Sequence, residues 1–242
     1  MVDVALDRAG GWLSAFAAER AEDLTAREQA LLLFGLATTE RIDEAEAIAV
    51  RLLGGPRDRP IDEEIAAGRF VMPLLAARAL PSGGGSREAL LAVCAGFEMP
   101  RALRWDVPLC DTLIPYAAPA DSVREICGEI AVASDFGLRE LALRQRDDLR
   151  RVLALWAFCF VHERDLEMVC PLVRALAFAG FSDAGEHHDA LQFILDQQRG
   201  DGHFCADELS VAAHARAQSG FDVAREVYLP LTIGAVWTLS AS

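Results

Sequence analysis

Lysine is missing from this sequence of 242 residues, because all 23 of its basic residues are arginine. A chain without lysine cannot form a Schiff base with pyridoxal phosphate or with a carbonyl substrate. It also lacks the lysine with which P-loop proteins and protein kinases contact phosphate groups. The absence therefore excludes several large classes of enzyme.

Aromatic residues are scarce, at 7%, whereas alanine and leucine are abundant, which favours helices over strands. Apolar residues make up 52% of the chain, enough for a sizeable core, so a disordered chain is excluded. No strictly alternating stretch of apolar and polar residues is long enough for a convincing strand, and apolar residues recur instead at spacings of three and four. These features predict an all-α fold.

Positive charge is also in deficit, and the net charge of −14 argues against binding to nucleic acids or to anionic membrane surfaces. The longest uncharged stretch, 227–242, contains Pro230 and is short for a membrane span. The N-terminus has no signal-peptide pattern. The six cysteines form no Cys-x-x-Cys motif and are expected to be reduced core residues. We therefore expect a cytoplasmic protein with a single domain over 1–242, and the sequence leaves its oligomeric state open.

The apolar periodicity predicts some dozen helices with short connections, many of which end in glycine. Capping boxes are predicted at Thr25–Glu28 and Ser122–Glu125, and Pro230 is predicted to begin a helix. Shorter helices are expected at 107–116 and 135–144, and a longer one at 206–218. This succession predicts helical hairpins that form an α/α toroid or a curved solenoid.

The segment from Asp189 to Phe204 resembles the repeat of terpenoid cyclases and protein prenyltransferases. In that repeat a helix ends with Gln, and an Asp-Gly turn and an aromatic residue follow. Gln198, Asp201, Gly202 and Phe204 match it, with Phe where Trp is commoner. The resemblance implies a ring of helices around a cavity that holds a small, largely apolar metabolite.

The catalytic signatures of those families are absent from the sequence. There is no Asp-x-Asp-Asp, and Asp147-Asp148-Leu-Arg-Arg has arginine where Asp-Asp-x-x-Asp has its third acid. We expect the two arginines to pair with these acids. A second segment, Ala133-Ser-Asp-Phe-Gly137, resembles parts of helical proteins from actinobacterial biosynthetic clusters, which implies a role in bacterial specialised metabolism.

Histidines are the main candidates for catalysis. His188 and His203, with Asp189 and Cys205, have the chemistry for an acid–base or metal site. The alternative is that His187 and His188 both lie on the surface at a helix N-terminus and that His203 is a variable turn residue. His187 and His188 point about 100° apart on a helix and do not suit one ion, so we expect no metal and no other cofactor.

His162 and Asp135 are weaker catalytic candidates. His162-Glu163 begins like a zincin motif, but the second histidine is replaced by Leu166, so that motif is rejected. His162 either ends a helix, where the dipole favours it, or is buried in the central cavity. Asp135 is either a helix-capping or turn residue or a catalytic acid.

The candidate ligand-binding residues are aromatic: Tyr228, Trp237, Trp156 and Phe204. Their alternative role is to fill a core. Together these features predict an enzyme or binding protein that holds a small apolar metabolite. The alternative is a non-enzymatic helical scaffold that binds a peptide or a partner protein.

Overall fold

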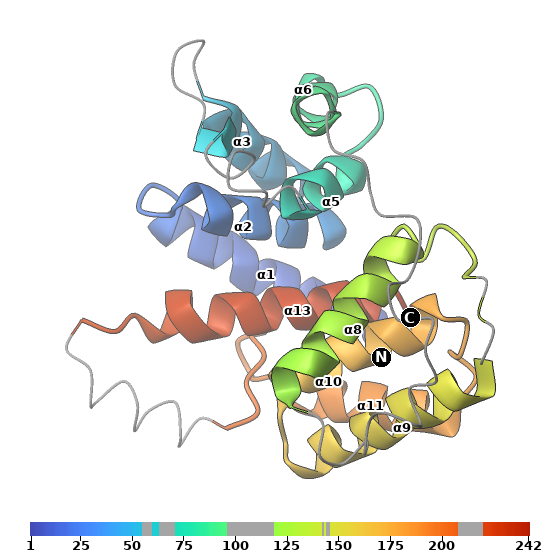
Figure 1. The fold of residues 1–242 in the computed structure, drawn as a ribbon. Helices are drawn as coiled ribbons and strands as arrows, with labels where there is room; N and C mark the ends of the chain where they lie inside the picture. The colour runs from blue at the N-terminus through green and yellow to red at the C-terminus, as the bar shows by residue number, and fades with distance from the viewer. Residues whose placement is uncertain (55–59, 63–70, 96–118, 142, 144–145, 208–219) are drawn as a thin grey trace. The chain divides into compact units, whose positions relative to one another are not determined.

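The computed structural model describes residues 1–54, 60–62, 71–95, 119–141, 143, 146–207 and 220–242 (Figure 1). These residues form helices joined by turns and loops, with no strand among them, and the predicted all-α fold is confirmed. The chain divides into two compact units, each of which is described by itself. The single-domain organisation stays a prediction.

Unit 1 contains the first five described helices, namely α1 (Val2–Arg20), α2 (Ala26–Thr38), α3 (Ile42–Leu53), α5 (Val71–Ala79) and α6 (Gly85–Cys94). Helix α2 packs against α1, α3 and α5, while α6 packs against α3 and α5. The unit also includes residues 199–204 and the C-terminal segment up to Trp237. Leu32, Leu33 and Leu36 are fully buried, so α2 supplies the centre of this core.

Unit 2 contains α8 (Ala120–Ala133), α9 (Arg146–His162), α10 (Leu166–Phe178) and α11 (Gly185–Asp196). Helix α10 packs against α8, α9 and α11, and α11 also packs against α9. Trp156 is 1% exposed and is the largest fully buried side chain among the described residues of this unit. It is therefore a core residue here.

The start of α2 follows the predicted capping box. The amide of Glu28 donates to Thr25 Oγ1, and the amide of Thr25 donates to the Glu28 carboxylate at 2.8 Å. Two groups that a helix N-terminus leaves unsatisfied are thus paired locally, and this prediction is confirmed.

Two local predictions are wrong. Helix α8 starts two residues before Ser122, with Pro119 at the N-cap and no side-chain cap, so the second capping box is not used. The described residues of 135–144 form turns and loop rather than a helix. Asp135 and Phe136 both have positive φ, at 49° and 58°, a backbone conformation that ends α8 instead of beginning a new helix.

The C-terminal helix α13 (Leu229–Ser240) begins one residue before Pro230, as predicted. One turn of π-helix, η2 (Ala224–Tyr228), precedes it, which the sequence pattern did not predict. The predicted helix at 107–116, Cys110 and most of the predicted helix at 206–218 lie outside the described residues. No helix in the described part of the chain is long and apolar enough to span a membrane.

Candidate functional site

The candidate site of unit 1 is built on the turn Arg199–Phe204. The amide of Arg199 donates to the carbonyl of His203 at 2.8 Å, and the amide of Gly202 donates to the carbonyl of Arg199 at 3.1 Å. Gly202 has a φ of 110°, which side-chain-bearing residues rarely adopt. The predicted Asp-Gly turn is therefore confirmed.

This turn lies directly against the backbone of α1. A Cβ atom added to Gly202 would lie 2.1 Å from the carbonyl oxygen of Arg8, far inside contact distance. The guanidinium of Arg8 donates to the carbonyl of Arg199. Glycine at 202 thus permits the close approach that brings the turn to α1.

The other end of the turn is fixed to α13. The amide of Phe204 donates to the hydroxyl of Thr232 at 3.1 Å, and both residues are fully buried. Phe204, predicted as a ligand-binding residue, is thus a core residue in this structure. Because Phe204 is fixed in the core, the preceding residue, His203, lies between α1 and the end of η2.

His203 is buried, with only 9% of its side chain exposed, and its two ring nitrogens differ. Nδ1 lies 2.6 Å from Oδ1 of Asp201, whereas Nε2 is buried without a hydrogen-bond partner. Because a carboxylate is only an acceptor, Nδ1 carries the hydrogen in this contact, which leaves the Nε2 of a neutral ring as an acceptor. This is the arrangement of a histidine oriented by an acid.

The rings of Tyr228 and Trp12 contact this imidazole. The ring of Tyr228 stacks on it with centroids 4.1 Å apart and an interplanar angle of 27°. The ring of Trp12 lies 5.8 Å away at 45°, and Trp12 in turn stacks on Phe16 at 5.3 Å. We call these four residues, Trp12, Phe16, His203 and Tyr228, the aromatic cluster. Trp12 and Tyr228 are only half-buried, so part of the cluster faces outward.

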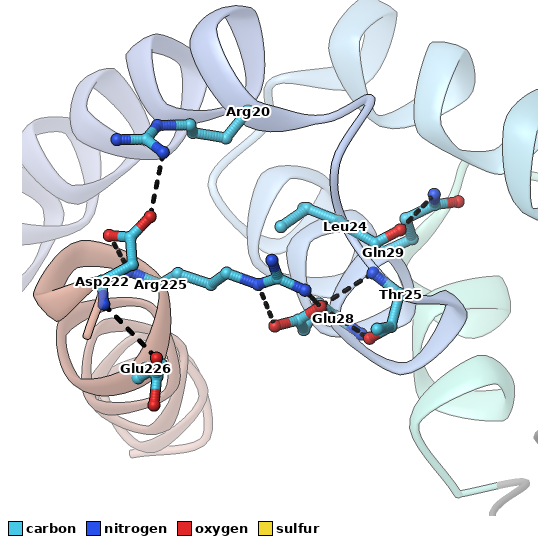
Figure 2. Close-up of polar contacts among 8 residues, drawn as sticks. All are labelled: Arg20, Leu24, Thr25, Glu28, Gln29, Asp222, Arg225 and Glu226. Carbon is cyan, nitrogen blue, oxygen red and sulfur yellow. Dashed lines mark hydrogen bonds and ion pairs between the residues drawn. The ribbon is translucent and has the colours of Figure 1, made fainter. Parts of the chain in front are cut away.

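Tyr228 is the last residue of η2, and ion pairs connect η2 to α2 and the residue Asp222, just before η2, to α1 (Figure 2). Arg225 donates two hydrogen bonds to Glu28, and Arg20 pairs with Asp222 at 2.9 Å. Single π-helical turns are frequent at functional sites, because they displace a side chain from the regular helical register. Here the π-helical turn η2 ends at Tyr228, whose ring stacks on His203.

Trp237, the other predicted aromatic of this unit, lies apart in the sequence at the end of α13. Its ring meets Phe34 of α2 edge-on, with centroids 5.7 Å apart. It therefore packs α13 on α2.

The remaining predicted site residues belong to unit 2. His188 is exposed, and its Nδ1 lies 3.0 Å from the carbonyl of Ala184, one turn earlier. His162 is the exposed last residue of α9 and contacts Phe158 at 4.5 Å, which matches the helix-end interpretation and not the buried one. Asp135 occupies a turn, as one of its two interpretations predicted.

Metal ligands do not gather in the described part of the chain, where no three or more His, Cys, Asp or Glu side chains are grouped suitably. Cys205 is buried and forms no disulfide. The acids of Asp147-Asp148 begin α9, and Arg151 lies 3.9 Å from Asp148, so the predicted pairing of arginine with acid is confirmed for these two residues.

Sequence reasoning missed two parts of this site. Asp201 was read only as a turn residue, although the spacing Asp-x-His in a turn is a signal for an acid that orients a histidine. Trp12 was read only as an apolar residue of the first helix. It lies 191 positions before His203, and no local spacing connects the two.

Comparison with known proteins adds no assignment: no family model, no curated protein and no solved structure matches the chain.

Proposed function

We propose that this protein holds a small, largely apolar metabolite against the aromatic cluster of unit 1, as an enzyme or as a binding protein. The observation that carries the proposal is the buried, unpartnered Nε2 of His203 beside the half-buried rings of Trp12 and Tyr228. Ligand sites typically combine apolar and aromatic walls with a few placed polar groups.

The pair Asp201–His203 supports the enzymatic form of this proposal. A histidine whose Nδ1 is tied to a carboxylate presents Nε2 in one orientation, and such a nitrogen can take a proton from a bound molecule. His203 is thus the catalytic candidate that the geometry favours over His188, His162 and Asp135. The latter three lie on turns or helix ends of unit 2.

The proposal also covers the arrangement of the helices and the role of the protein in the cell. We place the helical hairpins in an α/α toroid or a curved solenoid, and the protein in the cytoplasm with a role in bacterial specialised metabolism. The resemblance of the turn Arg199–Phe204 to the terpenoid cyclase repeat supports the ring arrangement. Small-angle X-ray scattering tests it, since a closed ring and an open solenoid differ in maximum dimension.

Native mass spectrometry of the full chain, purified from its own host, tests the ligand. We expect a retained small molecule of reproducible mass, lost in Trp12→Ala and Tyr228→Ala. Phe158→Ala is the matched control, because Phe158 is 56% exposed and belongs to unit 2. Protein that carries no such molecule, and that binds none from an apolar metabolite extract of the host, contradicts the proposal.

The scaffold alternative has one supporting observation, an apolar stripe on α9. Leu155 and Phe158 are 38% and 56% exposed, and the ring of Phe158 lies against His162 on the same helix face. Such a stripe suits a peptide or a partner protein. A defined complex that Phe158→Ala weakens about tenfold, and that Trp12→Ala leaves unchanged, supports this alternative.

A further inference from the structure

His203 offers a bound molecule one acceptor. The Nδ1 side of the ring is occupied by Asp201, whose Oδ1 also accepts from the amide of His203 at 3.3 Å. Nε2, on the opposite edge, is buried and has no partner. A buried acceptor without a hydrogen bond is destabilising, and native structures satisfy nearly all such groups. A ligand at this site would therefore have to bring a hydrogen-bond donor to Nε2.

The surroundings restrict the kind of donor. The rings of Tyr228 and Trp12 lie 4.1 and 5.8 Å from the imidazole, centroid to centroid, and give it aromatic neighbours. An anion brings no hydrogen to Nε2 and would meet the nearby carboxylate of Asp201. A metal ion would need further protein ligands, and the described residues offer no suitable group of three. A neutral O–H or N–H group on an apolar ring satisfies both the nitrogen and the aromatic walls.

We infer that the ligand of the aromatic cluster is a small ring compound with one neutral O–H or N–H group, which donates to Nε2 of His203. This inference rests on the proposed function, because it specifies the ligand of the same site. Because Nε2 is buried, neighbouring side chains must move for a donor to reach it. Asp201 acts as a positioning residue, since it holds Nε2 free of hydrogen.

A matched pair of probes tests the inference: p-cresol, which has the hydroxyl, and p-xylene, which has a methyl group in its place. Both are titrated into the full chain labelled with ¹⁵N-histidine, and the Nε2 resonance of His203 is assigned from its absence in His203→Gln. We expect p-cresol to bind at least about tenfold more tightly than p-xylene, since a buried acceptor would otherwise remain unpaired. Only p-cresol should shift the Nε2 resonance.

The variants separate the roles of the two side chains. His203→Phe keeps an aromatic ring and should remove the preference for p-cresol, whereas His162→Phe, at an exposed position of unit 2, should keep it. Asp201→Ala should move the Nε2 resonance of the free protein towards that of a protonated nitrogen and reduce the preference several-fold. An unchanged resonance in Asp201→Ala overturns the positioning role.

The outcomes for the two proposals differ. Equal binding of both probes at the cluster, with no shift of Nε2, overturns this inference and leaves the proposed function intact. If the wild-type chain binds neither probe and retains no molecule from its host, both proposals are wrong. The wild-type titration decides the inference even if a variant fails to fold.

Discussion

Arg225 donates two hydrogen bonds to the carboxylate of Glu28, from Nε at 2.6 Å and from Nη2 at 2.7 Å (Figure 2). The two residues are 197 positions apart in the sequence. The same carboxylate accepts from the amide and the hydroxyl of Thr25 in the capping box of α2. Glu28 therefore joins the start of α2 to η2, the turn that positions Tyr228 in the aromatic cluster.

Acid should weaken unit 1 through this carboxylate. Burial raises the pKa of Glu28, but hydrogen bonds from Arg225 and Thr25 outweigh that effect and lower the pKa from 4.5 to about 2. Because the folded pKa is lowered, the stabilisation is fully present above pH 4.5 and is lost as the pH falls through about 2. The shift corresponds to at most about 3 kcal/mol, and the partial exposure of both side chains reduces this to about 1–2 kcal/mol.

Urea unfolding of Glu28→Gln at pH 7 and pH 3 measures this contribution. The free energy of unfolding of the variant should be about 1–2 kcal/mol lower than that of the wild type at pH 7, and it should depend less on pH. Glu22→Gln is the control, since Glu22 is 87% exposed and lies 3.5 Å from Arg51; its loss should stay below about 0.5 kcal/mol. Equal losses in the two variants would contradict the special role of Glu28.

The turn Arg199–Phe204 should tolerate alanine at Gly200 and not at Gly202. Gly202→Ala places a Cβ 2.1 Å from the carbonyl oxygen of Arg8 at a φ of 110°, so we expect a loss of roughly 3 kcal/mol or more in the free energy of unfolding. Gly200→Ala, two residues earlier, meets no atom within 4 Å and should change stability by less than about 1 kcal/mol. Comparable thermal unfolding of both variants would show that the turn does not need this close approach.

Thiol reactivity should follow burial in unit 2. Burial raises the pKa of Cys127 to about 12 and that of Cys170 to about 11, although the nearby guanidinium of Arg174 opposes the rise for both thiols. Cys159 on α9 is only half-buried. Because the thiolate is the reactive form, iodoacetamide at pH 8 should label Cys159 well before the other two. Peptide-resolved mass spectrometry measures the order, and urea should abolish the difference between the three cysteines.

Much of the local structure could be predicted because it depends on residues a few positions apart. The capping box of Thr25 and Glu28 and the turn at Gly202 are examples, since each is set by short-range hydrogen bonds and backbone freedom. The box at Ser122 is not used because α8 begins two residues earlier, at Ala120, with Pro119 at its N-cap. A capping pattern in the sequence thus does not by itself fix where a helix starts.

The candidate site could be predicted only in part. His203 and Tyr228 were identified as candidates for different roles, but their stacking was not, because it depends on how the turn Arg199–Phe204 meets η2. More than 190 residues separate Glu28 from Arg225, and the same is true of Trp12 and His203. Contacts of this kind arise from packing, which no spacing in a single sequence encodes.

His187, rather than its neighbour His188, should make unit 2 sensitive to mild acid. It is 2% exposed, and neither ring nitrogen has a hydrogen-bond partner. Burial, and to a lesser extent the nearby His188, lowers its pKa below the usual 6.5. The unfolded chain then takes up a proton near pH 6.5 before the folded chain does, so stability is full above that pH and declines as the pH falls below it.

Replacing His187 by leucine should remove this acid sensitivity. His187→Leu eliminates two unsatisfied nitrogens, so its stability at pH 7.5 should lie within about 1 kcal/mol of the wild type. At pH 5 the variant should gain stability relative to the wild type, compared with the difference between the two proteins at pH 7.5. His188→Gln, at an exposed position, should keep the pH dependence of the wild type. Urea unfolding at the two pH values measures all three proteins, and an unaltered slope in His187→Leu would assign the acid sensitivity to other groups.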